Sequence, residues 1–270
     1  MRVVICAMAK NEHLYINDWV KHYLSIGFDK IYLYDNDDLD KPYIGDYIDQ
    51  KLKEKVEIIN IRGIAKKHLQ YDIYTDFYRK NHFDWVFYCD IDEYLVGISN
   101  IKLWLEQWKF KYINQIRIKW KLFGDDDLIE RDMRKPVWKC FKKEIKSSLN
   151  RNLIDKGTLE NQGKAFVRGG NPNVVVHSPH YASYCVGGNV IPSMLPSGKP
   201  CYSRVEIKEN YSHETVYLYH YMTKSLSEFI NQKLNRNDAV YNQEVTLDYY
   251  WRINKKTPKK LEWLKEMGLI

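Results

Sequence analysis

The sequence has few cysteines and no long apolar run. Its 270 residues include five Cys, and none of them belongs to a CxxC pair. This spacing argues against a zinc site and favours a reducing compartment. No apolar stretch reaches the roughly 20 residues that a membrane-spanning helix needs. The apolar run at 2–8 is too short for a signal peptide and leads directly into charge. We therefore expect a cytoplasmic protein, soluble or held peripherally at the inner membrane face.

The chain also lacks an uninterrupted basic stripe. There are 42 Lys and Arg against 35 Asp and Glu, which gives a formal net charge of +7. Acidic residues are interleaved with the basic ones along nearly the whole chain, unlike the basic surface of a nucleic-acid-binding protein. The modest excess favours phosphate-bearing ligands or an anionic membrane surface, and it also simply aids solubility. We expect no nucleic-acid partner.

Apolar runs and amphipathic stretches alternate over the first third of the chain. Strands are predicted at 2–9, 30–34, 56–61 and 85–95. Helices are predicted from Tyr15 to Gly27 and from His68 to Lys80, with a short one near 44–53. Strands alternating with helices at these lengths predict an α/β fold with a mostly parallel, helix-covered sheet.

The pattern changes after residue 95. Ser99 is expected to cap a helix that contains Trp104 and Trp108. Further strands are predicted at 116–120, 164–168, 174–177 and 215–221, and the Gly- and Pro-rich stretch 187–200 indicates a long loop that closes a site or is disordered. Ser225 and Glu228 form a capping box, and a last helix starts at Thr257-Pro258 with Leu261, Leu264 and Met267 facing inward. Residues 134–161 fit no pattern.

Asp90 and Asp92 follow the apolar run at 85–89. A strand that ends in Asp-x-Asp places both carboxylates on one side, because side chains alternate with period two. Hard oxygen donors at the carboxyl edge of such a sheet suit Mg²⁺ or Mn²⁺ carrying a diphosphate, whereas the alternative is that they cap the next helix. As carboxylates at the surface edge, they are expected to carry little packing, so Asp92→Ala should leave the fold intact.

Other polar clusters also stand where predicted strands end. They are Lys10-Asn11-Glu12, Asp35-Asn36, Asp125 and His220. Carboxyl ends of parallel strands lie along one sheet edge, so we expect the earlier clusters to converge.

Four of these segments resemble the family 92 type (DUF23-like) glycosyltransferases and their bacterial family 2-like relatives. They are Lys10-Asn11-Glu12 with Trp19, Gly27 and Tyr34-Asp35-Asn36; Cys89-Asp90-Ile91-Asp92-Glu93-Tyr94; Trp120-Lys121-Leu122-Phe123-Gly124-Asp125; and His220-Tyr221-Met222-Thr223-Lys224-Ser225. The matches span 4–235 in the family's order. The acidic triplet 125–127 departs from the smaller or amide side chains of many relatives.

The resemblance implies a single GT-A domain over 1–270. Its nucleotide-sugar-binding half would be 1–96, its acceptor-binding half with site-closing elements 97–235, and its helical tail 236–270. It implies transfer of a sugar from a nucleotide-sugar, expected to be UDP-linked, to a saccharide or lipid-linked saccharide, with a divalent metal. The donor-binding residues are expected to be Asn11, Glu12, Asp35, Lys67, Gln70, Asp90, Ile91 and Lys224.

The roles of individual residues follow from the chemistry. A metal on Asp90 and Asp92, with His220 as third ligand, would neutralise the leaving diphosphate, and Lys224 would add a cation and nearby helix N–H groups. The alternative for His220 is a satisfied core residue. Asp35 accepts from a uracil or guanine N–H, or it caps the next turn.

Inverting transfer needs a general base on the acceptor side. Asp125 is the first candidate for this base and Asp127 the second. The alternative is that residues 125–127 form a solvated acidic turn. His177 and His180 would line the acceptor side, or form a zinc pair. At the C-terminus, Lys255-Lys256 and Lys259-Lys260 flank Trp251 and Trp263, which suits contact with an anionic membrane or a solvated helix face.

Two other functions compete. A nucleotidyltransferase shares the sheet and the acidic site, but it would normally carry a Gly-rich phosphate loop after the first strand, and residues 7–11 contain no Gly. A nucleic-acid-binding module would need the continuous basic surface that this chain lacks.

Overall fold

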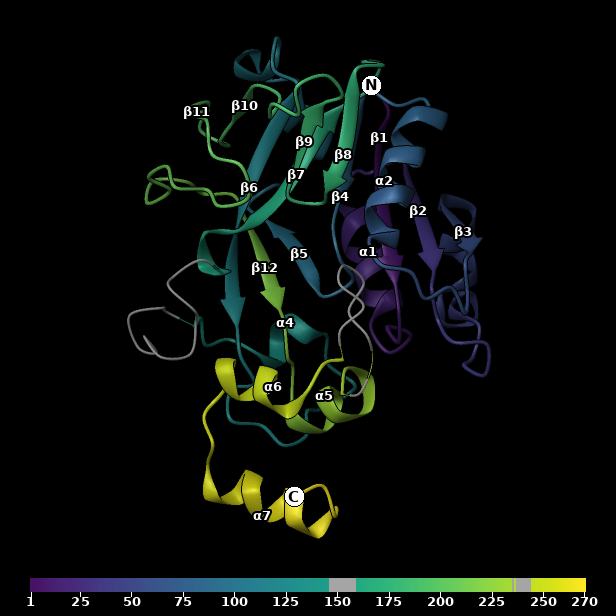
Figure 1. The fold of residues 1–270 in the computed structure, drawn as a ribbon, viewed down its shortest axis with the longest axis vertical. Coiled ribbons are helices and arrows are strands. Elements are labelled where there is room, and N and C mark those ends of the chain that lie inside the picture. The colour runs from purple at the N-terminus through teal and green to yellow at the C-terminus, as the bar shows by residue number, and fades with distance from the viewer. Residues whose placement is uncertain (146–158, 235, 237–243) are drawn as a thin grey trace.

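A computed structural model describes residues 1–145, 159–234, 236 and 244–270 (Figure 1). Strands and helices alternate in its first part, as β1 Val3–Ala9, α1 Ile16–Ser25, β2 Lys30–Asp35, β3 Val56–Asn60, α2 Leu69–Lys80 and β4 Trp85–Tyr88. These four strands lie in the order β3-β2-β1-β4, and each neighbouring pair is parallel. The predicted α/β fold with a mostly parallel sheet is therefore confirmed.

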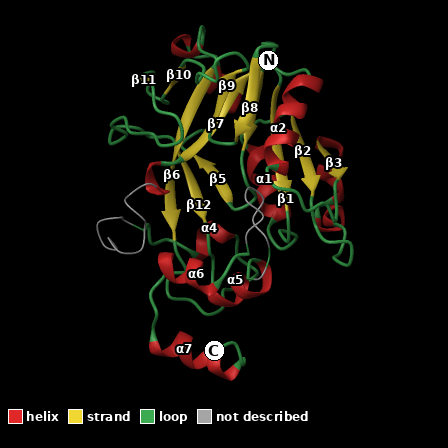
Figure 2. Ribbon diagram, viewed as in Figure 1, coloured by secondary structure: helices red, strands yellow, loops and turns green. Residues whose placement is uncertain are grey.

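The two long helices cover opposite faces of this sheet (Figure 2). In β1, Val3 and Ile5 pack in the same core cluster as Trp19 of α1, whereas Val4 and Cys6 pack with Tyr74 of α2. Because side chains alternate along a strand, a continuous apolar run such as 3–9 supplies both faces at once. This double burial is what the sequence pattern predicted.

The predicted short helix near 44–53 is two 3₁₀ helices, η1 Ile44–Tyr47 and η2 Gln50–Lys55. The backbone between them is extended at Ile48 and leaves the helical region at Asp49. Ile44 is fully buried, while η2 contains no buried residue. A single helix would need one apolar stripe through both segments, and the second segment does not supply it.

The sheet continues beyond β4 with strands from the later part of the chain. These are β5 Glu93–Val96, β6 Gln115–Phe123, β7 Gly163–Arg168, β10 Ser193–Met194, β11 Pro200–Cys201 and β12 Tyr217–Tyr221. β7 is antiparallel to both β4 and β6, β10 is parallel to β6, and β11 is antiparallel to β10. β12 is parallel to β6 and antiparallel to β5. The later strands thus join the first four in one sheet.

The segment 85–95 differs from the predicted single strand. β4 ends at Tyr88, residues 89–92 form a turn, and β5 begins at Glu93 and pairs with β12. Strand alternation therefore does not govern Asp90 and Asp92, so the period-two argument that placed them on one side does not apply to this turn.

A second, two-stranded sheet lies over α2. It consists of β8 Val174–Ser178 and β9 Tyr181–Tyr184 in antiparallel pairing. Val174 and Val176 pack in the core cluster that contains Phe77 of α2. The stretch 187–200, expected to be a plain loop, contains β10 and the start of β11. Its closure over a ligand stays a prediction.

Short helices follow β5. They are α3 Ile101–Leu105, η3 Trp108–Phe110, α4 Val137–Cys140 and η6 Leu159–Asn161. Asn100, not Ser99, caps α3, and its side chain accepts hydrogen bonds from the N–H groups of Lys102 and Leu103 at 3.1 Å. Trp108 is 88% exposed and lies outside that helix. Much of the unplaced stretch 134–161 lies outside the described residues.

Three helices close the chain, α5 Leu226–Gln232, α6 Leu247–Ile253 and α7 Pro258–Glu266. The predicted capping box of Ser225 and Glu228 is present at the start of α5. In α7, Leu264 is buried as expected, whereas Met267 lies beyond the helix end and is exposed, so its predicted inward position is wrong. In the part of the chain that the structure describes, no helix is long and apolar enough to cross a bilayer.

Candidate active site: a buried network of carboxylates and cations

The turn between β4 and β5 is held in place by α1. The indole N–H of Trp19 donates to the carbonyl oxygens of Asp90 and Glu93, both at 3.1 Å. The hydroxyl of Tyr23, one helical turn later, donates to the Glu93 carbonyl at 3.0 Å. Both side chains are completely buried. The apolar stripe of α1 therefore also fixes the backbone that carries the carboxylates.

Asp90 is paired with a buried lysine from β7. Its Oδ2 lies 2.6 Å from Nζ of Lys164, whose side chain is only 2% exposed. Its Oδ1 accepts a hydrogen bond from Gln70 of α2 at 3.1 Å. Burial opposes ionisation of Asp90, but the Lys164 ammonium outweighs it and lowers the pKa of the carboxyl. Asp90 is therefore an anion with both oxygens engaged.

Asp92 is paired with a second buried lysine from the opposite end of the chain. Its Oδ2 lies 2.5 Å from Nζ of Lys233, and its Oδ1 lies 3.3 Å from Nε2 of His220. Burial alone would raise the pKa of Asp92, yet Lys233 and His220 hold it well below its usual range. Asp92 is 6% exposed. The expectation that it sits at a surface edge with little packing is therefore wrong.

Glu93 follows the two aspartates in sequence and faces His220 across the β5–β12 ladder. Its Oε2 accepts the N–H of Asp90 at 2.9 Å, while its Oε1 has no hydrogen-bond partner among the described residues and lies 3.9 Å from Nδ1 of His220. Burial, helped by the neighbouring carboxylates, raises the pKa of Glu93 well above its usual range, so we expect it to be protonated. Burial lowers the pKa of His220, which we expect to be neutral.

Glu12 and Lys224 complete the network at the end of β1. The Lys224 ammonium lies 3.4 Å from Oε2 of Glu12 and 3.8 Å from the ring centroid of Tyr15. Arg236 reaches the other Glu12 oxygen at 3.6 Å. Lys224 has φ +57, a left-handed conformation that is uncommon for a residue with a side chain and often marks functional sites.

Several predicted donor contacts lie beside this network. Asn11 has φ +57, and its N–H donates to the carboxylate of Asp37. Asp35 is fully buried and its Oδ1 accepts the N–H of Asp37 at 3.1 Å, so it caps the turn that follows it, one of the two roles expected for it. The Ile91 side chain lies in the core, so only its backbone is available to a ligand. Lys67 is exposed.

The contacts of Asp125 lie elsewhere. Its Oδ1 accepts the N–H of Asp127 at 2.8 Å, and its Oδ2 contacts the hydroxyl of Tyr250 and the ammonium of Lys260. Asp127 pairs with Lys259 at 3.0 Å and also with Lys260. Both aspartates therefore anchor the C-terminal helices α6 and α7, and their predicted role as base remains untested.

The two predicted acceptor-side histidines have different outcomes. His180 places Nδ1 2.6 Å from the carbonyl oxygen of Gly163, and its ring lies 5.4 Å from that of Trp120, the strand residue that also packs against His220. The side chain of His177 lies outside the described residues. In the described chain, no group of three or more His, Cys, Asp or Glu is arranged to hold a metal, so a zinc pair gains no third ligand.

Two of the central cations were missed by the sequence analysis. Lys164 stands two residues before Phe166 in β7, so the period of two places both side chains on the same, inward face. Lys233 follows Leu226 and Phe229 at helical spacing of seven and four, so it extends their buried stripe. Periodicity places both lysines on inward faces, but it does not show which side chains would balance their charge there.

No family model matches this chain, and no curated protein matches it. Among solved structures, S. aureus TarS is similar over 62% of this chain and 28% of its own, with 11% identity and a TM-score of 0.36. TarS 1–349 in complex with UDP-GlcNAc is similar over 62% of this chain and 45% of its own, with 11% identity and a TM-score of 0.35. Mannosyltransferase PcManGT from Pyrobaculum calidifontis, in complex with GDP-Man and Mn²⁺, is similar over 43% of this chain and 35% of its own, with 12% identity and a TM-score of 0.32. The chain thus spans less than half the length of each of these proteins.

Proposed function

We propose that this protein is a GT-A type glycosyltransferase that moves a sugar from a nucleotide-sugar, UDP-linked in the first instance, to a saccharide or lipid-linked saccharide. The observation that carries the proposal is the network in which the half-buried Asp90 and the buried Asp92, Lys224 and Lys233 meet near the carboxyl ends of β1 and β4. Open α/β sheets bind ligands at this edge. The motif resemblance to the family 92 type supports the same assignment.

Glycosyl transfer from a nucleotide-sugar is favoured by cations beside the leaving diphosphate. In glycosyl transfer the bond between the sugar's anomeric carbon and the diphosphate oxygen breaks, a bond to the acceptor oxygen forms, and the acceptor proton passes to a base. Negative charge grows on the leaving diphosphate, and preorganised cations in a water-poor site stabilise it strongly. Lys224 and Arg236 both form ion pairs with Glu12, and Lys233 forms an ion pair with Asp92. These three cations are our candidates for holding the diphosphate.

The start of α5 offers less than expected. The hydroxyl of Ser225 accepts the N–H of Glu228, and the Glu228 carboxylate accepts the N–H of Ser225 at 3.2 Å. These two groups of the capping box are therefore already used. Lys224 can still contribute its ammonium to the diphosphate, without the help of those backbone groups.

A divalent ion, Mn²⁺ or Mg²⁺, on Asp90, Asp92 and His220 stays a prediction. The donor types suit such an ion, which would neutralise the diphosphate. However, all four oxygens of the two aspartates are engaged by Lys164, Lys233, Gln70 or His220. As they are arranged, these residues fit a metal only if Lys233 leaves Asp92.

Inversion with Asp125 as base also stays a prediction. To take a proton, Asp125 would have to be released by Tyr250 and Lys260, which both contact its Oδ2. NMR of the product's anomeric centre tests the stereochemistry independently: a configuration that matches the donor's contradicts inversion.

Titration calorimetry with UDP, GDP and their sugar conjugates tests donor binding. Lys224→Met should weaken binding of the matching nucleotide roughly tenfold or more, since hydrogen bonds to charged groups contribute about 1.5–3 kcal/mol. The matched control is Lys139→Met, because Lys139 is exposed and lies in α4. Equal affinity in both variants contradicts the placement of the diphosphate, and binding of no nucleotide contradicts the function.

A further inference from the structure

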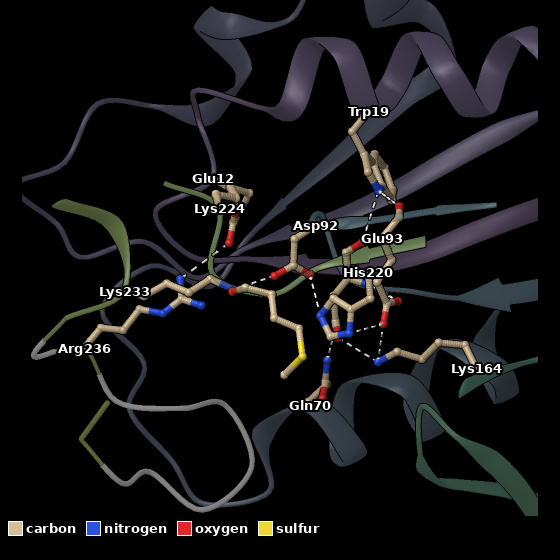
Figure 3. A network of polar contacts seen from close by, with 12 residues as sticks. Glu12, Trp19, Gln70, Asp92, Glu93, Lys164, His220, Lys224, Lys233 and Arg236 are labelled. Carbon is tan, nitrogen blue, oxygen red and sulfur yellow. Dashed lines mark hydrogen bonds and ion pairs between the residues drawn. The ribbon is translucent and has the colours of Figure 1, made fainter. Parts of the chain in front are cut away.

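Lys233 has the contacts of a cation built into the site. Its ammonium lies 2.5 Å from Oδ2 of Asp92 and 2.6 Å from the carbonyl oxygen of Met222. Its side chain is 9% exposed and extends from the C-terminal end of α5 toward the turn that follows β4 (Figure 3). An ammonium group has three N–H donors. These two contacts leave one N–H for a ligand.

A second lysine matches it from the other side. Lys164 lies 2.6 Å from Oδ2 of Asp90 and 3.6 Å from Oε1 of Glu93, and it comes from β7 in the centre of the sheet. Each carboxylate of the Asp-x-Asp turn therefore has its own buried ammonium. The remaining oxygens face Gln70 and His220.

This arrangement competes directly with a divalent ion. Mg²⁺ binds carboxylate oxygens at about 2.0–2.1 Å. An ion at that distance from Asp92 would lie beside the Lys233 ammonium, and two cations so close repel each other strongly where water is scarce. The nearby acids are already balanced, because Glu12 faces Lys224 and Arg236.

We propose that Lys233 takes the place of a divalent ion at Asp92 and, together with Lys224, binds the diphosphate of the donor directly. Lys164 acts as a positioning residue that holds Asp90. The diphosphate part of this inference rests on the proposed function, whereas the competition between Lys233 and a metal at Asp92 does not. No bond is made or broken by Lys233, whose part is electrostatic.

Mn²⁺ binding followed by electron paramagnetic resonance tests the competition without any donor. Wild-type protein and Lys139→Met should bind Mn²⁺ weakly, and Lys233→Met should bind it at least tenfold more tightly through Asp92 and His220. The gain should vanish in Lys233→Met combined with Asp92→Asn. Tight binding of one Mn²⁺ by the wild type, with no gain in Lys233→Met, overturns the proposal.

Titration of UDP and GDP in EDTA and in Mn²⁺ tests the diphosphate role. The wild type should bind its nucleotide equally well in both solutions, and this arm does not depend on whether any variant folds. Lys233→Met should bind at least tenfold more weakly in EDTA, with recovery in Mn²⁺. Wild-type binding that requires Mn²⁺ overturns the proposal and favours a metal that displaces Lys233. If the wild type binds no nucleotide in either solution, the proposed function fails, and the Mn²⁺ experiment still decides the place of Lys233.

Discussion

Lys233 and Asp92 form a buried ion pair at 2.5 Å although 141 positions separate them in sequence. The pair joins the C-terminal end of α5 to the turn after β4, so it closes the site with a contact between two distant parts of the chain. Its geometry has consequences for stability as well as for ligand binding.

Asp92→Ala should destabilise the protein, because it leaves the Lys233 ammonium buried without its partner. Removal of one member of a buried pair costs about 3–5 kcal/mol of unfolding free energy. Urea unfolding followed by circular dichroism measures the loss. The double variant Asp92→Ala with Lys233→Met should recover most of it, because no unpaired charge remains. Equal stability of wild type and Asp92→Ala would show that the pair is not formed.

Lys260→Met should release α7 from the rest of the protein. The Lys260 side chain is completely buried against Asp125 and Asp127. Limited proteolysis with mass spectrometry should show faster cleavage of the segment between α6 and α7 in this variant and in Asp125→Asn. The control Lys265→Met, at an exposed position, should show no such change. If Asp125→Asn instead lowers turnover by about 10²–10⁴ while α7 stays protected, Asp125 acts as the base.

Stability should fall in mild acid because of His180. Burial, with the nearby Lys164 ammonium, lowers the pKa of His180 to about 3. In the unfolded chain the pKa is about 6.5, so below that pH the unfolded state binds a proton that the folded state does not. This group should reduce the unfolding free energy by up to about 1.4 kcal/mol per pH unit between 6.5 and 3. Urea unfolding at pH 7.5 and 5.0 should show a smaller drop for His180→Gln, and an equal drop would count against this origin.

The C-terminal basic segment should contribute to binding at anionic vesicles, with fewer cations than the sequence suggests. Lys260 is buried, whereas Lys255, Lys256 and Lys259 are exposed. Each cation near an anionic surface contributes about 1 kcal/mol. Changing Lys255 and Lys256 to Glu should therefore reduce sedimentation with such vesicles, relative to Lys139→Glu in α4. Deletion of 255–270 is a poorer test, because it also removes the partner of Asp125. Unchanged sedimentation rules out the membrane contact.

The sequence predicted those parts of the fold that depend on local pattern. The continuous apolar run of β1 and the stripe of Trp19 and Tyr23 define the parallel sheet and its covering helix, and the capping box at Ser225 marks α5. Each of these features depends on residues that are close together in sequence, so periodicity and capping rules predict it.

The sequence could not predict contacts between distant segments. The turn at 89–92 divides the predicted strand 85–95 in two, and only the fold shows that Glu93 then pairs with His220 of β12. Periodicity places Lys164 and Lys233 on apolar faces, but only the fold shows that Asp90 and Asp92 meet them there. The tie between Asp125 and Lys260 likewise depends on how the C-terminal helices return to the sheet.

Release of nucleoside diphosphate from a panel of UDP- and GDP-sugars, separated by chromatography, tests the central claim most directly. The wild type should consume one donor and release its diphosphate faster when an acceptor saccharide is supplied. Asp90→Asn should lower this rate by about 10²-fold or more, since Asp90 belongs to the charge network that the leaving group meets. Lys139→Met should match the wild type. If no sugar nucleotide is consumed and nucleoside triphosphates instead yield pyrophosphate, the protein is a nucleotidyltransferase and the account given for this site is wrong.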